Sequence, residues 1–258
     1  MTINFKETEI HFEDYGSGQT VVLLHGFLEN STMWDEFIPL FSVENRIITV
    51  DLLGHGQTGC IGYVHSMELM AESVNRVLEH LDIDEALLIG HSMGGYVALA
   101  FAELYPKKIN GLCLMNSTAA ADSEERKLNR DRAIKAVKQN HTAFIGMSVA
   151  NLFAENNRIR FSKEIDEVKK EALKMPVQGV VAALEGMKDR KERSEVLSAG
   201  TFKKMVVLGK KDPVLDFDML INQMKPINIK IVEFPDGHMS HIENKKELSY
   251  NLIQFIEK

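Results

Sequence analysis

Cysteine is scarce in this sequence. Cys60 and Cys113 are the only two among 258 residues. They lack the close pairing of zinc and redox motifs, and they cannot build the dense disulfide framework of small secreted proteins. We therefore expect packing roles for both thiols, no metal site, and a location in the reducing cytoplasm.

Long apolar runs and a basic charge balance are also missing. No stretch approaches the roughly 18 apolar residues that cross a bilayer, and residues 1–13 mix charged with apolar side chains, unlike a secretory signal peptide. The formal net charge is -7, and lysine and arginine are scattered along the chain, so no basic stripe is available for a phosphate backbone. We expect neither a membrane nor a nucleic acid as a partner.

The composition that remains is that of an ordinary globular domain, with 45% apolar and 26% charged residues. Short apolar runs alternate with segments whose apolar residues recur every three or four positions. This pattern predicts an α/β fold with a mostly parallel central sheet flanked by helices. After an entry hairpin in residues 3–15, the expected strands are residues 21–24, 47–50, 86–89, 112–115, 205–208 and 227–234. The expected covering helices are residues 67–81, 94–104 and 245–256.

One long interval interrupts the alternation. From residue 119 to residue 198 there is no strand pattern, and charged helical segments such as residues 122–138 fill it. Pro176 predicts a break between two of these helices, because proline disfavours helical geometry in the residue before it. We therefore expect a core domain made of residues 1–118 and 199–258, with an all-helical insertion at residues 119–198.

The chemistry concentrates first in the segment Gly90-His91-Ser92-Met93-Gly94. It follows an expected strand and opens an expected helix, the context in which a serine sits on a sharp turn with its hydroxyl exposed above the sheet. Small residues two positions before and after the serine let strand and helix approach closely, and both glycines meet that need. Ser92 is therefore the candidate nucleophile. The alternative is a tight turn in which Ser92 only caps the helix.

A serine hydroxyl is a poor nucleophile unless a base takes its proton and a carboxylate orients that base. Asp212 closely follows the strand expected at residues 205–208, and His238 follows the last expected strand. Because the carboxyl ends of parallel strands lie at one edge of a sheet, we expect Ser92, Asp212 and His238 to converge as nucleophile, acid and base.

Other side chains compete for these roles. His241 is the serious alternative base, since it lies three residues beyond His238, whereas His91 is expected to pack behind the sheet. The competing carboxylates are expected to hold turns or begin helices, where acidic residues suit the helix dipole; they are Asp51, Asp122, Asp216 and Asp218.

Several motifs occur in an order that resembles the α/β-hydrolase superfamily: His25-Gly26-Phe27, residues 51–56, residues 90–95, residues 209–212 and Gly237-His238. They span nearly the whole chain. The resemblance implies a serine hydrolase that needs no cofactor or metal. It also implies an oxyanion hole formed by the backbone N–H groups of Phe27 and Met93, with His25 anchoring the loop that carries the first of them.

The resemblance further implies that the helical insertion covers the site as a cap whose lining sets specificity. The candidate pocket residues are His25, Phe144, Met147, Phe153, Met175 and Met187. The side chains from the insertion suit the interior of cap helices equally well. Lys188 and Arg190 are candidates for meeting an anionic substrate, although a charged run of this kind is usually a solvated face.

The leading hypothesis is hydrolysis of a small-molecule carboxylic ester or related acyl compound through an acyl-serine intermediate. One alternative is carbon–carbon bond hydrolysis, or an elimination like that of the menaquinone-pathway synthase of this superfamily, which uses the same three residues and needs an anion site in the cap. Another alternative is a ligand receptor on the same fold with little turnover.

Overall fold

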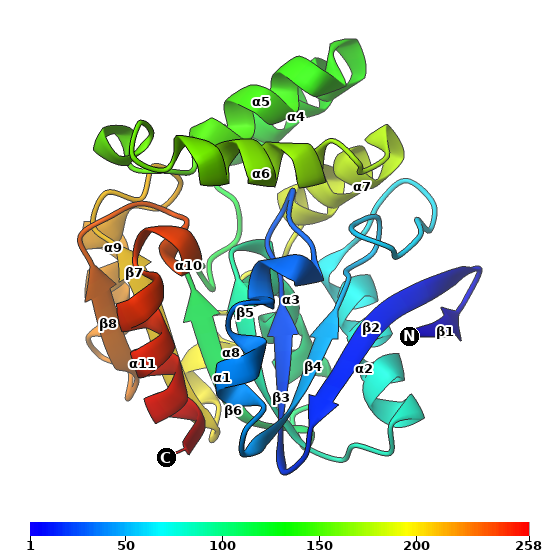
Figure 1. The fold of residues 1–258 in the computed structure, drawn as a ribbon, viewed down its shortest axis with the longest axis vertical. Coiled ribbons are helices and arrows are strands. Elements are labelled where there is room, and N and C mark those ends of the chain that lie inside the picture. Colours follow the sequence, from blue (N-terminus) through cyan, green and yellow to red (C-terminus); the bar gives the residue numbers. More distant parts are fainter. Residues whose placement is uncertain (258) are drawn as a thin grey trace.

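Eight strands form one sheet at the centre of the protein. The structure is a computed structural model that describes residues 1–257, and its sheet has the order β1-β2-β4-β3-β5-β6-β7-β8 (Figure 1). The strands β1 and β2 run antiparallel to their neighbours, whereas the pairs from β4 to β8 are parallel. This confirms the predicted fold class. The strands are β1 (Thr2–Phe5), β2 (Thr8–Gly16), β3 (Gln19–Leu24), β4 (Asn45–Val50), β5 (Ala86–His91), β6 (Ile109–Met115), β7 (Lys203–Gly209) and β8 (Lys230–Phe234).

The central strands are buried on both faces, as their unbroken apolar sequences predict. Every residue of β5 is buried, and neighbouring side chains point to opposite faces. Leu88 packs in the core under α2 (Met67–His80) and α3 (Met93–Leu104). Leu87 packs in the core under α1 (Ile38–Phe41) and α11 (Lys245–Glu257). Since each buried leucine contributes about 1.5–3 kcal/mol, the two cores hold the sheet as a rigid platform.

One expected strand differs in its first residue. The last strand begins at Lys230, because the N–H of Ile227 donates to the oxygen of Met224 (2.9 Å) and closes the end of α9 (Phe217–Met224). The expected entry hairpin forms between β1 and β2, and β2 also pairs antiparallel with β4. The remaining short helices are η1 (Ser31–Trp34), η2 (Glu155–Asn157) and α10 (Ser240–Glu243).

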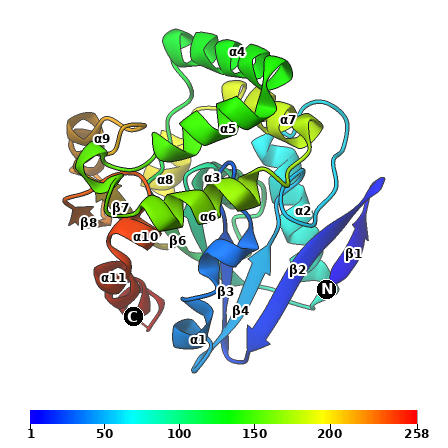
Figure 2. The same ribbon diagram turned by 45° about the horizontal axis from the view of Figure 1, so that its top comes forward.

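In the described chain, the interval between β6 and β7 contains helices and no strand. Four of them lie over the carboxyl ends of the strands (Figure 1), and Figure 2 shows them as a layer above the sheet. They are α4 (Glu124–Gln139), α5 (His141–Ala150), α6 (Ser162–Ala172) and α7 (Val177–Lys188). Ser123 caps α4, since its Oγ accepts from the N–H of Arg126 (3.3 Å), and Asp122 therefore lies outside the helix. Pro176 is the N-cap of α7, which agrees with the expected break.

The helix α8 (Ser194–Ala199) does not join this layer. It packs against α3, and its Leu197 is fully buried in the core. Just before it, Arg193 Nη2 donates to Glu68 Oε1 (2.6 Å) and to Glu103 Oε2 (2.8 Å). The layer above the sheet therefore ends earlier than the expected boundary at residue 198.

None of the helices in residues 1–257 combines the length and the apolar character that crossing a bilayer requires.

Candidate active site

Ser92 occupies a strained turn between β5 and α3. Its φ is 48° and its ψ is -111°, a conformation that costs a residue with a side chain about 1–3 kcal/mol. A Cβ at Gly90 would lie 2.3 Å from the oxygen of Gly94, and one at Gly94 would lie 2.5 Å from the oxygen of Leu24. Only glycine therefore allows the helix to start this close to the sheet, as the sequence motif predicts.

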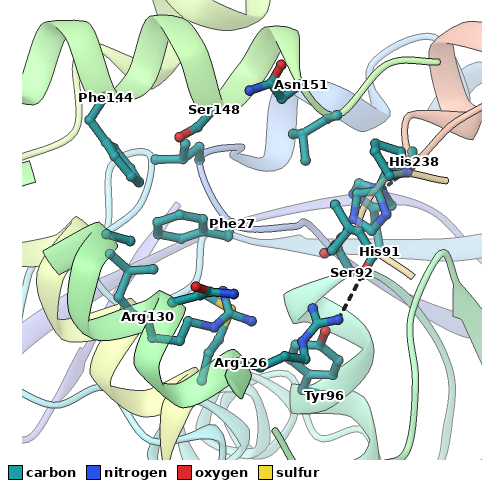
Figure 3. Close-up of a pocket in the computed structure, with 18 of the residues that line it drawn as sticks. Phe27, His91, Ser92, Tyr96, Arg126, Arg130, Phe144, Ser148, Asn151 and His238 are labelled. Carbon is teal, nitrogen blue, oxygen red and sulfur yellow. Dashed lines mark hydrogen bonds between the residues drawn. The ribbon is translucent and has the colours of Figure 1, made fainter. Parts of the chain in front are cut away.

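Three predicted residues form one hydrogen-bonded chain. His238 Nδ1 lies 2.7 Å from Asp212 Oδ2, and His238 Nε2 lies 2.8 Å from Ser92 Oγ. An ionised carboxylate can only accept, so Nδ1 carries the ring proton and Nε2 accepts from the serine hydroxyl. Figure 3 shows Ser92 and His238 at one side of the cavity. The arrangement can deprotonate the serine during attack on a carbonyl carbon.

The loop after β7 holds Asp212 in its ionised form. Its Oδ1 accepts from the N–H groups of Val214 (2.8 Å) and Leu215 (3.0 Å), and its Oδ2 also accepts from Asn116 Nδ2 (3.1 Å). Burial raises the pKa of Asp212, but the charge and hydrogen bond of His238 together with the other donors outweigh it, so the pKa lies below its usual value. The carboxylate stays charged and can stabilise a protonated imidazole.

Asn116 is a site residue that the sequence reasoning missed. It follows β6 directly, has a φ of 46°, and also donates from Nδ2 to the oxygen of Gly237 (3.2 Å). It thus joins the loop of the acid to the loop of the histidine. Its position at the carboxyl end of a buried strand was the available signal.

His91 and His241 lie behind His238. His91 Nδ1 lies 2.6 Å from Glu29 Oε2, and His91 Nε2 donates to the backbone oxygen of His238 (3.0 Å). His241 Nε2 instead faces Glu29 Oε1 at 3.5 Å. Burial lowers the pKa of His241 to about 4. The structure therefore directs His238, and not His241, toward Ser92.

Glu29 is the charged centre of this buried cluster. Burial raises its pKa, but the charge and hydrogen bond of His91 outweigh that effect and lower the pKa to about 2. Burial by itself would lower the pKa of His91, but the attraction of the Glu29 carboxylate is stronger than this effect of burial. The pKa of His91 is therefore raised. The resulting pair is ionic and supports the backbone of His238 from behind.

The other carboxylates hold local structure. Asp51 accepts from the N–H groups of Ser31 and Gln57, each at 2.8 Å, and so holds the turn at residues 54–56. Asp216 caps α9 through the N–H of Met219 (2.9 Å), and Asp218 lies in the first turn of that helix. Asp122 accepts from Arg190 Nη1 (2.6 Å) beneath α4.

The two backbone amides expected to form the oxyanion hole follow neighbouring strands of the sheet. Phe27 follows β3, Met93 is the first residue of α3 after β5, and β3 pairs with β5 in parallel. The first N–H groups of a helix have no acceptor within it, which leaves them available to a ligand. His25 anchors the first loop: its Nε2 accepts from the N–H of Leu52 (2.9 Å) and its Nδ1 donates to the oxygen of Gly26 (2.8 Å).

A cavity of about 680 Å³ opens between Ser92 and the helical layer. Figure 3 shows Phe144, Ser148 and Asn151 on one side of it and Arg126 and Arg130 on the other. Apolar side chains form much of the wall; they are Phe27, Leu28, Ala133, Phe144, Leu152, Leu184, Met187 and Val214.

The expected pocket residues divide into two groups. Phe144 and Met187 line the cavity. Met147 is 65% exposed on the outside of α5, whereas His25, Phe153 and Met175 are buried among other residues and do not line it. The helix α5 is apolar on several sides, so its sequence does not reveal which side faces the site.

The two cationic candidates also lie outside the cavity lining. Lys188 pairs with Asp131 (3.0 Å), and the Arg190 guanidinium is buried against Asp122 and the ring of Tyr96, 4.1 Å from its centroid. The arginines that do line the cavity are Arg126, Arg130 and Arg158, which the sequence reasoning did not select.

Solved structures share the fold of this chain. A thermophilic esterase from Thermogutta terrifontis, solved with malate bound, matches 100% of this chain and 97% of its own with a TM-score of 0.93 at 30% identity. An enol-lactonase from Burkholderia xenovorans LB400 matches 100% of both chains with a TM-score of 0.92 at 20% identity, which shows the shared fold alone.

Curated relatives match in sequence. A 2-hydroxy-6-oxononadienedioate/2-hydroxy-6-oxononatrienedioate hydrolase from Paraburkholderia xenovorans is 36% identical over an alignment of 126 positions, which covers 46% of this chain and 43% of that protein. The dihydrolipoyllysine-residue acetyltransferase component of the acetoin cleaving system of Pseudomonas putida is 29% identical over 258 residues, with 96% of this chain and 66% of that protein covered. This chain thus spans less than two thirds of the length of both relatives.

The family model that describes the alpha/beta hydrolase fold matches residues 19–245. Together with the similarity to the Thermogutta terrifontis esterase along the whole chain, this shows that the protein belongs to the α/β-hydrolase family.

Proposed function

We propose that the protein hydrolyses carboxylic esters through an acyl intermediate on Ser92. The observation that carries the proposal is the distance of 2.8 Å between Ser92 Oγ and His238 Nε2, in a ring whose other nitrogen is held by Asp212. The similarity to an esterase along the whole chain supports the same reaction.

In the first half of the proposed reaction, His238 takes the hydroxyl proton as Ser92 attacks the carbonyl carbon, and then gives it to the departing alcohol. The backbone N–H groups of Phe27 and Met93 would donate to the oxyanion, a contribution of about 3–4 kcal/mol for one donor in such sites. In the second half His238 activates a water that releases the acid. The ionised Asp212 stabilises the imidazolium in both halves.

We also propose that residues 119–198 act as a cap, with α4–α7 as the part that encloses substrate. Support comes from Phe144 and Met187, which project from this layer into the cavity above Ser92. A cytoplasmic location stays a prediction that rests on the scarcity of cysteine.

Carbon–carbon bond hydrolysis is the second candidate, because the Paraburkholderia xenovorans relative is named as a hydrolase of 2-hydroxy-6-oxo-dienoate compounds. The same three residues would serve it. Parallel assays separate the two: preference for aryl esters over a 2-hydroxy-6-oxo-dienoate supports the esterase, and the reverse preference supports the second candidate. A ligand receptor would bind without turnover of either compound.

The decisive experiment compares Ser92→Ala with Ser148→Ala on 4-nitrophenyl acetate. Both serines line the cavity, but the hydrogen bond to His238 Nε2 is made by Ser92. Ser92→Ala should abolish turnover and labelling by a fluorophosphonate, whereas Ser148→Ala should keep both. Labelling at another serine, or turnover that survives in Ser92→Ala, would refute the assignment.

A second comparison tests the base. His238→Ala should lose activity, while His241→Ala should retain most of it, because His241 faces Glu29 and not the nucleophile. Turnover that survives in His238→Ala, or a greater loss in His241→Ala than in His238→Ala, would contradict the assignment of His238 as the base.

A further inference from the structure

The cavity next to Ser92 has a charge opposite to that of the whole chain. The formal net charge of the protein is -7. Yet the cavity is lined by Arg126, Arg130 and Arg158 and by the carboxylate of Glu125. His91 also borders the cavity, but Glu29 balances its charge. Glu125 is exposed, so water screens it strongly. The cavity is therefore basic where the surface as a whole is acidic.

Asp122 neutralises only part of this charge. Its buried carboxylate faces Arg190 Nη1 at 2.6 Å, Arg130 Nε at 3.1 Å and Arg126 Nε at 3.3 Å. One negative charge thus meets three positive charges. Burial raises the pKa of Asp122, but the charges of Arg130 and Arg190 lower it by more. The pKa therefore lies below its usual value and the carboxylate stays ionised.

The hydrogen bonds leave guanidinium N–H groups free for a ligand. A guanidinium carries five N–H donors, and Arg130 uses only its Nε on Asp122. Within residues 1–257 its two terminal nitrogens have no protein acceptor, and the buried Nε of Arg158 has none either. Figure 3 shows the Arg126 and Arg130 side chains reaching into the cavity from the same helix, α4.

The arginines are connected to the catalytic loop. Arg126 Nη1 donates to the oxygen of Val214 (2.8 Å), and the N–H of Val214 donates to Asp212 Oδ1 (2.8 Å). Only one residue, Pro213, therefore separates this anchor from the proposed acid. The same contact holds α4 down over the site, so the basic wall lies within the cavity that Ser92 opens into.

We infer that Arg130, with Arg126 beside it, binds a free carboxylate on the substrate, so that the preferred substrates are esters or lactones that also carry an anionic carboxylate. The planar guanidinium fork matches a carboxylate in geometry, and such charge-assisted pairs are stronger than neutral hydrogen bonds. The apolar residues Phe27, Leu184 and Met187 in the same wall suit a short hydrocarbon segment between the carboxylate and the reacting carbonyl. This inference rests on the proposed esterase function and specifies its substrate class.

The experiment uses two pairs of esters that differ in one carboxylate. On the acyl side, mono-4-nitrophenyl adipate is compared with 4-nitrophenyl hexanoate. On the alcohol side, 3-acetoxybenzoate is compared with 3-methylphenyl acetate. For each pair the quantity measured is the ratio of kcat/KM for the charged ester to that for the neutral ester, with the uncatalysed rate subtracted.

In at least one pair the wild-type ratio should exceed one, and Arg130→Gln should lower it by about tenfold or more, the effect expected for one lost charge-assisted hydrogen bond. Lys135→Gln is the matched control, because it removes one positive charge from an exposed position of the same helix, and it should leave the ratio unchanged. Arg130→Lys, which keeps the charge without the fork, should lie between Arg130→Gln and the wild type.

A ratio that changes less than twofold in Arg130→Gln for both pairs would overturn the inference. If that variant does not fold, inhibition of the wild type replaces it: adipate should inhibit hydrolysis of the neutral hexanoate ester more strongly than 1,6-hexanediol does. Added salt should weaken the inhibition by adipate. Equal inhibition by both compounds would overturn the inference. If the wild type hydrolyses no ester, the proposed function fails. Calorimetric binding of adipate to Ser92→Ala then tests the carboxylate site separately, and absence of binding overturns it.

Discussion

Asp122→Asn is the substitution whose consequence follows most directly from the structure. The Asp122 side chain is fully buried, and the side chains of its partners Arg190, Arg130 and Arg126 are 3%, 17% and 35% exposed. An amide of the same shape turns an N–H₂ group toward guanidinium donors and leaves three positive charges without a counter-charge. Removing one partner of a fully buried ion pair costs about 3–5 kcal/mol.

We expect a smaller loss here, because Arg126 and Arg130 border the cavity and can turn toward water. The free energy of unfolding should fall by about 2–4 kcal/mol, which lowers Tm by roughly 4–16 °C for a chain of this size. The matched control is Asp131→Asn on the same helix. Asp131 pairs with Lys188 while 48% exposed, so its loss should cost at most about 1 kcal/mol.

The pH dependence identifies the group responsible. Arginine stays protonated over the accessible range, so only the carboxylate titrates. The pKa of Asp122 is lowered in the folded protein, so its stabilisation is complete above the unfolded value, about 3.9, and is lost as the pH falls through the folded value. The difference between wild type and Asp122→Asn, measured by urea unfolding, should be full at pH 7 and shrink below about pH 4. Equal stability of Asp122→Asn and Asp131→Asn at pH 7 would refute the reasoning.

Three further predictions concern the site. Asp212→Asn should lower kcat by about four orders of magnitude with little change in KM, because the imidazole loses its orienting acceptor; steady-state kinetics with 4-nitrophenyl acetate measure this, and a loss below tenfold contradicts the role. Gly90→Ala should destabilise the fold, because its Cβ would lie 2.3 Å from a backbone oxygen. At Gly146 in α5 a Cβ would meet nothing within 4 Å, so Gly146→Ala should raise the free energy of unfolding by as much as about 1 kcal/mol. Thermal melts that show the opposite order would disprove the packing argument. Glu29→Gln should lower the free energy of unfolding at pH 6–7. The difference in this free energy from wild type should shrink as the pH falls from about 4.5 toward 2, because His91 lowers the pKa of Glu29 to about 2. A difference that does not change with pH over that range would argue against the ionic pair.

Much of the core followed from local pattern. The continuous apolar runs at residues 86–89 and 112–115 predicted buried strands because a parallel sheet covered on both faces has no polar side, and both runs lie inside strands of the structure. Ser92 was recognisable because the turn that it occupies needs glycine on either side. Asp212 and His238 were recognisable because each follows a strand, and strand ends share one edge of the sheet.

The lining of the cavity did not follow in the same way. Phe144 and Met147 lie three residues apart on α5 and have similar character, yet the first lines the cavity and the second is 65% exposed. Arg126 and Arg130 belong to a charged helical segment, and the sequence does not show that both arginines pair with the buried Asp122 and border the cavity. Asn116 gained its role only from its contact with Asp212, which is 96 positions away in the sequence, and Glu29 only from its contact with His91, which is 62 positions away.

The sequence by itself thus determined the fold class, the turn that carries the candidate nucleophile, and the chain order of its partners, because short-range sterics and the period of apolar residues encode these features. The tertiary structure alone decided which face of each helix in the layer above the sheet borders the cavity, and where unpaired arginine charge collects. Those features depend on long-range packing and on the balance of buried charges, which no local pattern of residues records.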